Sequence, residues 1–264
     1  MITAHRLAGI VLVLASIQLA APLGAQSAPW LGEEDEIERF LATAEPISRE
    51  RMGSGITRPY KVLLELEGRR RQAVFKPIVR SAFAGGAESY RSEVAAYRLS
   101  RHLGIDMVPP TVERRLGRRY GSLQLWVDGF RPFVHAIDEP PASFGDWSRQ
   151  MARMSLFDLL IDNPDRHAAN FLVDPHWNVV LIDHSRALNS NHRGPLRTAP
   201  PPMRFERELI ERIAALDLTA LRELLGDQLS GSDLRTLLLR RDELLAHVER
   251  IADRRGPQIA FYRD

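Results

Sequence analysis

The chain has 264 residues, of which 44% are hydrophobic and 27% charged, a composition typical of globular proteins. Its length suits one bilobal domain or two small ones and argues against disorder over most of the chain. The formal net charge of +2 comes from scattered arginines, so nucleic acid is not an expected partner. The chain has no cysteine, which excludes disulfides, zinc–thiolate sites and cysteine nucleophiles.

The N-terminal segment has the pattern of an export signal. His5 and Arg6 precede an apolar stretch over residues 7–21, and small residues follow. These are the charged, hydrophobic and cleavage regions of a signal peptide, predicted here over residues 1–25. The mature protein is then periplasmic or secreted, with no stable membrane insertion. The alternative is an uncleaved anchor, for which the stretch is short against the roughly 20 residues of a membrane span.

Residues 30–127 are predicted to form a first lobe of strands and one long helix. The apolar pattern predicts a helix over 33–43, strands over 60–67 and 72–77 with a hairpin connection at 68–71, a helix over 87–103, and strands over 111–115 and 122–127. The long helix is expected to pack against the hairpin.

Residues 128–264 are predicted to form a second, mainly helical lobe. Prolines and glycines indicate a connection over 128–146. The pattern then predicts a helix over 147–161, a polar loop over 162–170, short strands over 171–174 and 178–183, a proline-rich loop over 189–203, and mostly helix over 205–254. The proline-rich loop suits an activation-type segment or a plain surface loop.

Lysine is scarce, so its positions are informative. Lys61 and Lys76 are the two lysines among 36 basic residues. The strand period of two places Val74 and Lys76 on one face, which sets an ammonium beside an apolar patch, as a nucleotide's phosphates and base require. The structural alternative is a lysine at a strand end with its ammonium in solvent. Of two glutamates in the predicted helix, Glu93 suits an ion pair with Lys76 better than Glu88, because apolar residues flank it.

The loop over 162–170 carries polar residues at a spacing typical of kinases. Asp165 and Asn170 are five positions apart, like the catalytic aspartate and metal-binding asparagine of protein kinases. Asp183 follows a hydrophobic strand and corresponds to the second metal ligand. In phosphoryl transfer, metal and lysine neutralise charge while a carboxylate orients the attacking hydroxyl. The ordered set therefore predicts a site for ATP with Mg or Mn.

Weaker signals accompany this set. Gly53 and Gly55 suit a loop that covers phosphates, and Val127 with Trp126 suits either a hinge that meets adenine or ordinary core packing. A hydrolytic metal site is a further alternative, although the spacing of its candidate ligands fits no helical metal motif. These ligands are His167, His176, His184 and His192.

Three segments carry a family likeness: 73–77 (AVFKP), 92–99 (SEVAAYRL) leading to 108–112 (VPPTV), and 156–160 (LFDLL) running into 163–167 (NPDRH). Together they resemble the atypical kinases of the eukaryotic secretory pathway, of the Golgi casein kinase type, and more distantly the phosphoinositide 3/4-kinases. The resemblance spans roughly residues 50–190. It implies an α+β, bilobal protein-kinase-like fold, with a small mixed sheet-plus-helix N-lobe and a mainly helical C-lobe.

The resemblance also implies roles for individual residues. Lys76 would contact ATP phosphates, Glu93 would orient Lys76, Asp165 would act at the acceptor hydroxyl, and Asp183 would bind metal. In lipid kinases the histidine of Asp-Arg-His shares the catalytic role, which makes His167 a second catalytic candidate.

The expected function is that of an exported, ATP-dependent phosphotransferase acting on a hydroxyl of a protein or a small molecule. One alternative is a non-catalytic pseudokinase that serves as a partner-binding scaffold, and another is a nucleotidyl (AMP) transferase on the same fold, because a fold does not dictate its chemistry. Turnover of ATP separates the first two, and the part of ATP that is transferred identifies the third.

Overall fold

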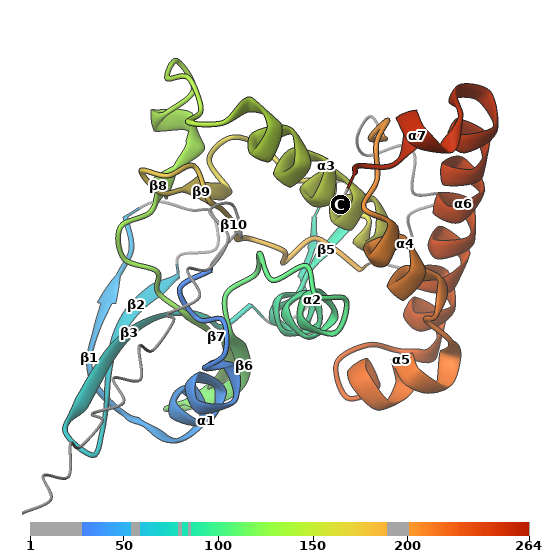
Figure 1. Cartoon of the computed structure of the whole chain (residues 1–264). Helices are drawn as coiled ribbons and strands as arrows, with labels where there is room; N and C mark the ends of the chain where they lie inside the picture. Colours follow the sequence, from blue (N-terminus) through green and yellow to red (C-terminus); the bar gives the residue numbers. More distant parts are fainter. Residues whose placement is uncertain (1–27, 54–58, 79–80, 84–85, 189–200, 264) are drawn as a thin grey trace, which may run out of the picture.

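The computed structural model describes residues 28–53, 59–78, 81–83, 86–188 and 201–263. Their buried apolar side chains form two clusters. The smaller cluster lies between a sheet and the first helix, and the larger one lies within a mainly helical body (Figure 1). The predicted signal peptide, Gly55 and most of the proline-rich loop lie outside the described residues. Within the described part of the chain, no helix is both long and apolar enough to span a bilayer.

The smaller cluster is built on a five-stranded antiparallel sheet. In spatial order its strands are β1 (Glu45–Arg51), β2 (Tyr60–Leu66), β3 (Arg69–Lys76), β7 (Arg119–Leu125) and β6 (Thr111–Leu116). Helix α1 (Glu34–Thr43) packs on this sheet with Ile37, Phe40 and Leu41 buried, a spacing that places all three on one helical face.

The β2–β3 hairpin is tighter than the sequence pattern predicts. Its loop is the two residues Glu67 and Gly68, both with positive φ, and not the predicted segment 68–71. Two such residues form the turn whose twist matches that of antiparallel strands. The following arginines therefore belong to β3, and each pairs with a glutamate. The pairs are Arg69–Glu36, Arg70–Glu65 and Arg71–Glu33.

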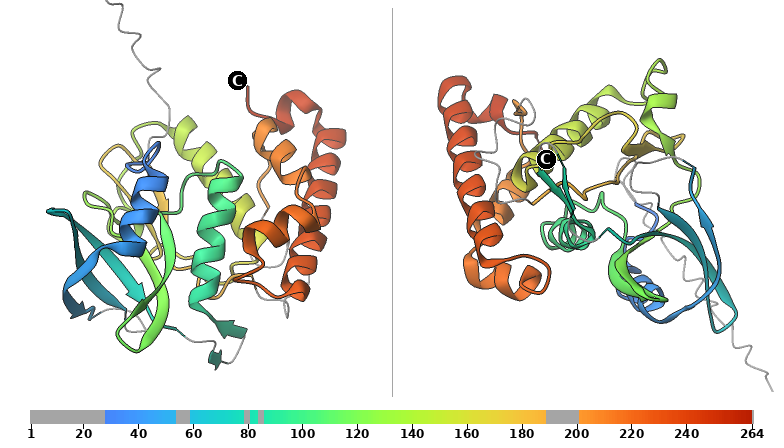
Figure 2. Two further views of the ribbon diagram at one scale, coloured as in Figure 1. Left: turned by 90° about the horizontal axis from the view of Figure 1, so that it is seen from below. Right: turned by 180° about the vertical axis from the view of Figure 1, so that it is seen from behind.

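Helix α2 (Tyr90–His102) lies between the sheet and the C-terminal helices (Figures 1 and 2). A short hairpin of β4 (Ser81–Phe83) and β5 (Gly86–Glu88) precedes it. The helix begins later than predicted because the Ser89 hydroxyl accepts a hydrogen bond from the Arg91 backbone N–H as its cap. Helix α2 packs mainly on β6, β7 and α5 (Leu218–Leu225), and it meets the β2–β3 hairpin through the ion pair of Glu93 with Lys76.

The mainly helical body begins inside the segment predicted as a connection. That segment holds strand β8 (Arg131–Pro132) and a 3-10 helix over Phe133–His135. The ring of Phe133 stacks on Phe171 at 4.7 Å and packs against Trp147 and Trp177, which anchors the connection to the body. The remaining elements are α3 (Phe144–Ile161), β9 (Phe171–Val173), β10 (Val179–Leu181), α4 (Arg207–Ala214), α6 (Gly231–Arg255) and α7 (Pro257–Ala260).

Candidate active site

A cavity of about 560 Å³ is lined from one side by β3 and β7 and from the other by the loops that flank β9 and β10. Most of the residues singled out in the sequence meet here. The cavity is lined by Lys76, Val127, Asp165, His167, Asn170 and Asp183. Glu93 contacts Lys76 from α2. Gly53 is exposed and does not line the cavity, although its neighbour Met52 does.

The Lys76 ammonium is held between two carboxylates. Its Nζ lies 2.5 Å from Glu93 Oε1 and 3.0 Å from Asp183 Oδ1. Burial by itself lowers the pKa of Lys76, but the charges of Asp183 and Glu93 outweigh burial and raise that pKa above its ordinary value. In turn the ammonium holds the pKa of Asp183 below its usual range. The cavity therefore contains a fixed cation beside an ionised carboxylate.

His184 joins α2 to the loop that precedes β9. Its backbone N–H donates to Glu93 Oε2 at 3.1 Å, and its buried ring nitrogen Nε2 lies 2.9 Å from Arg166 Nη2. Because a guanidinium only donates hydrogen bonds, Nε2 is the acceptor and the ring proton is on Nδ1. Burial and Arg166 keep the pKa of His184 well below its ordinary value, so the ring is neutral.

Arg166 braces the loop that carries Asp165. It forms a two-pronged ion pair with Asp158, with Nε 2.8 Å from Oδ2 and Nη2 3.0 Å from Oδ1. Its Nη1 also donates to the carbonyl oxygens of Asn170 and Ile182. Asp158 is buried in α3, and its ion pair with Arg166 was not predicted from the sequence. The available signal was a carboxylate inside the apolar stretch 156–160, because a buried carboxylate needs a partner.

The ends of this loop place Asp165 and Asn170 differently. Asp165 lines the cavity, and the backbone N–H of Asp165 donates to Asn163 Oδ1 at 3.2 Å. The side chain of Asn170 is buried, its Nδ2 donates to the Asp165 carbonyl, and its Oδ1 accepts from the His167 N–H at 2.9 Å. This amide stabilises the loop, and its role as a metal ligand stays a prediction. The side chain of His167 is exposed at the cavity.

Much of the remaining cavity lining is apolar. Val127 belongs to the smaller core and also lines the cavity, and its contact with adenine stays a prediction. The indole of Trp126 has the Lys61 ammonium over its ring at 3.9 Å. Both lysines of the chain are therefore engaged in the described structure, one by carboxylates and one by an aromatic ring.

The side chains fit a metal that arrives with a nucleotide. In the described ranges, no cluster of three or more histidine, aspartate or glutamate side chains could hold a metal alone. Asp183 Oδ1 is occupied by Lys76, and the second oxygen of this partly exposed carboxylate is directed at no described donor. Magnesium is commonly bound by one or two carboxylates together with phosphates and water. Asp183 would hold such an ion.

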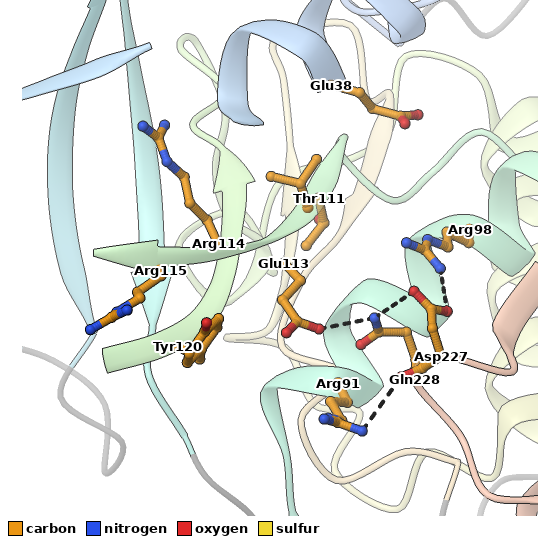
Figure 3. Close-up of a pocket in the computed structure, with 11 residues that line it drawn as sticks. Glu38, Arg91, Arg98, Thr111, Glu113, Arg114, Arg115, Tyr120, Asp227 and Gln228 are labelled. Atoms are coloured by element: carbon orange, nitrogen blue, oxygen red, sulfur yellow. Dashed lines mark hydrogen bonds and ion pairs between the residues drawn. The ribbon is translucent and has the colours of Figure 1, made fainter. Parts of the chain in front are cut away.

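A second cavity, of about 480 Å³, lies between β6, α2 and the loop after α5 (Figure 3). Its polar side chains pair with one another: Gln228 donates to Glu113 and to Asp227 at 3.0 Å each, and Arg98 lies 2.7 Å from Asp227. It offers no lysine and no pair of carboxylates around a cation, so the cavity at Lys76 is the candidate active site.

Comparison with solved structures agrees with this fold. A Golgi casein kinase solved with Mn and ADP has a TM-score of 0.61 and 16% identity, covering 85% of this chain and 77% of the other. A hydra Fam20 solved with a sugar has a TM-score of 0.64 and 16% identity, covering 87% of this chain and 92% of the other. These matches confirm the predicted kinase-like fold.

Sequence comparison identifies the family. The protein Rv2133c of Mycobacterium tuberculosis is 29% identical over 137 residues, which cover 40% of this chain and 48% of the relative, so the chain spans about half the length of that relative. Residues 87–230, more than half of the chain, match the family model for phosphatidylinositol 3- and 4-kinase. This region holds Glu93, Asp165 and Asp183, three of the residues gathered at the cavity. The chain therefore belongs to the phosphatidylinositol 3- and 4-kinase family of kinase-like phosphotransferases.

Proposed function

We propose that this protein transfers the γ-phosphoryl group of ATP, bound with Mg or Mn, to a hydroxyl of a protein or a small molecule. The observation that carries the proposal is the placement of Lys76, Asp183 and Asp165 on one cavity, with Lys76 anchored by Glu93. The family match supports phosphoryl transfer, and the Mn- and ADP-bound neighbour supports the choice of nucleotide and metal.

The side chains divide the work of the reaction. The Lys76 ammonium and Asp183 would hold the charged end of the nucleotide, and Mg or Mn would supply further neutralisation of the phosphates when bound. The acceptor oxygen forms a bond to the γ-phosphorus while the bond from phosphorus to the bridging oxygen breaks and ADP leaves. The acceptor proton passes to the Asp165 carboxylate, which lines the same cavity. His167, exposed nearby, is a second candidate for this proton.

The apolar lining of the cavity suits the adenine base. Its walls come from β3, β7 and the two short strands of the body, and they present aliphatic side chains without a fixed charge. These side chains are Val74, Leu125, Val127, Leu172 and Ile182. Apolar walls with a few polar groups at one end are the usual form of a nucleotide pocket.

We further propose export, with a signal peptide over residues 1–25 and a periplasmic or secreted mature protein. The support is the sequence pattern of that segment alone. Intact mass of the protein recovered from the periplasm or medium tests it. A mass that includes residues 1–25 would contradict cleavage.

Transfer is tested with γ-labelled ATP and Mg or Mn, with label followed into the chain itself or an added acceptor and ADP release measured in parallel. Asp165→Asn should lower transfer by several orders of magnitude, to a small measurable remainder, and should keep ATP binding, because Lys76 and Asp183 are untouched. Asp183→Ala should lose transfer and the metal-dependent part of ATP binding. Product mass distinguishes phosphoryl from adenylyl transfer. Metal-dependent ATP binding with no ADP release above that of Asp165→Asn would overturn the proposal in favour of a scaffold.

A further inference from the structure

The cavity contains a second permanent cation that the sequence pattern did not single out. Arg186 follows Asp183 by three residues, and its guanidinium Nη1 lies 3.0 Å from Asp165 Oδ1. Its Nε donates to Glu88 Oε1 at 2.7 Å. Among the described residues that line the cavity, Lys76 and Arg186 are the two that carry a permanent positive charge.

We infer that Arg186 is a positioning residue for phosphoryl transfer, holding the Asp165 carboxylate by one oxygen so that the other faces the acceptor hydroxyl. The inference rests on the proposed function of Asp165. No described group donates to Asp165 Oδ2, whereas Oδ1 is engaged by Arg186. A carboxylate fixed at one oxygen loses its freedom to rotate and presents the second oxygen in one direction.

Glu88, which binds the Arg186 guanidinium, is held in place just before the start of α2. The Ser89 backbone N–H donates to the Ser185 carbonyl at 2.8 Å, which joins the residue before Arg186 to the cap of α2. Glu88 precedes that cap and is buried. A guanidinium presents its donors in a rigid planar fork, so one side chain can hold Glu88 and Asp165 at once. Arg186 thus connects the start of α2, which also carries Glu93, to the loop of Asp165.

The inference predicts a separation of kcat from ATP affinity. Arg186→Gln should lower kcat by about 10- to 100-fold, the order expected when a reacting group is misplaced. The Kd for ATP with Mg should change by less than about threefold. Arg186 is inferred to act through Asp165, the proton acceptor, and Asp165 is not needed to bind ATP. Arg186→Lys should recover activity only in part, because one ammonium cannot reproduce the fork that contacts Glu88 and Asp165.

A double-mutant cycle distinguishes positioning from a general structural effect. If Arg186 acts through Asp165, then Arg186→Gln should cost little when added to Asp165→Asn, because the group that it positions is already gone. Arg115→Gln is the matched control, since Arg115 is an exposed arginine on β6 that does not line this cavity and donates to the Gly117 carbonyl. It should leave transfer unchanged.

The measurements are kcat from ADP release, Kd for ATP by calorimetry, and the unfolding midpoint of each variant. Three results would each overturn the inference and leave the proposed function standing. They are an unchanged kcat in Arg186→Gln, a raised kcat in that variant, and a loss of kcat in the Asp165→Asn background as large as the loss in the wild-type background. A wild-type protein that forms no ADP would overturn both the inference and the proposed function.

Discussion

Replacing Lys76 with methionine tests whether the Lys76–Glu93 pair is the electrostatic centre of the site. The methionine side chain keeps most of the volume but leaves Glu93, whose side chain is 2% exposed, without its cation. Removing one partner of a buried ion pair costs about 3–5 kcal/mol. A chain of this size loses roughly 2–4 °C of Tm per kcal/mol, so Lys76→Met should lower Tm by roughly 6–20 °C.

A second substitution, Glu93→Gln, should restore much of this loss. The glutamine amide carries no charge, and its oxygen can still accept the hydrogen bond from the His184 N–H that Glu93 accepts. Asp183, whose side chain is 39% exposed, can be stabilised by water without Lys76. Lys76→Met/Glu93→Gln should therefore regain about half or more of the lost stability, since replacing a whole buried pair is often nearly neutral.

The assay is thermal unfolding followed by circular dichroism, with ATP affinity measured in parallel. Both variants should lose metal-dependent ATP binding, because the phosphate-binding ammonium is absent from each. A single variant with unchanged Tm, or a double variant no more stable than the single, would show that the buried charge of Glu93 does not depend on Lys76.

Three further outcomes are expected. Asp183→Ala should abolish the effect of Mg on ATP affinity in calorimetry, and an affinity that still responds to Mg would count against Asp183 as the metal ligand. Because burial keeps the pKa of His184 well below its usual value of about 6.5, the unfolded chain binds a proton that the folded chain does not. The free energy of unfolding, measured by urea titration, should therefore fall by about 1.4 kcal/mol per pH unit below pH 6.5. His184→Gln should make this dependence on pH less steep. The same pH dependence in the wild type and the variant would exclude His184 as its source. Gly121→Ala should destabilise by about 1–3 kcal/mol, because the added Cβ would lie 2.6 Å from the Lys76 carbonyl oxygen, whereas Gly53→Ala meets open space and should be neutral. Equal Tm values for the two glycine variants would refute the close approach.

The success of sequence reasoning depended on whether a signal was local. Lys76 ends β3 after the apolar residues 73–75, Asp183 follows the apolar strand β10, and Asp165 lies in a polar loop between elements. Spacing along the chain was therefore sufficient to select them. Strand β1 carries no such signal, because all seven of its residues are exposed and apolar side chains do not alternate along it. Arg186 was missed for a different reason, since one arginine among many has no distinguishing pattern.

Sequence patterns were sufficient for the kinase-like class of the fold, for its longer strands and helices and for most of the charged residues of the site. Only the tertiary structure decided which charges pair. Lys76 pairs with Glu93 across 17 positions, while Glu88, the alternative partner, pairs with Arg186 across 98. Such choices depend on distance and burial between elements that are remote along the chain, because the strength of an ion pair changes steeply with the separation of its charges and their exposure to water. The separation of two charges and their exposure to water are set only when the lobes pack, so they cannot be read from the order of the residues.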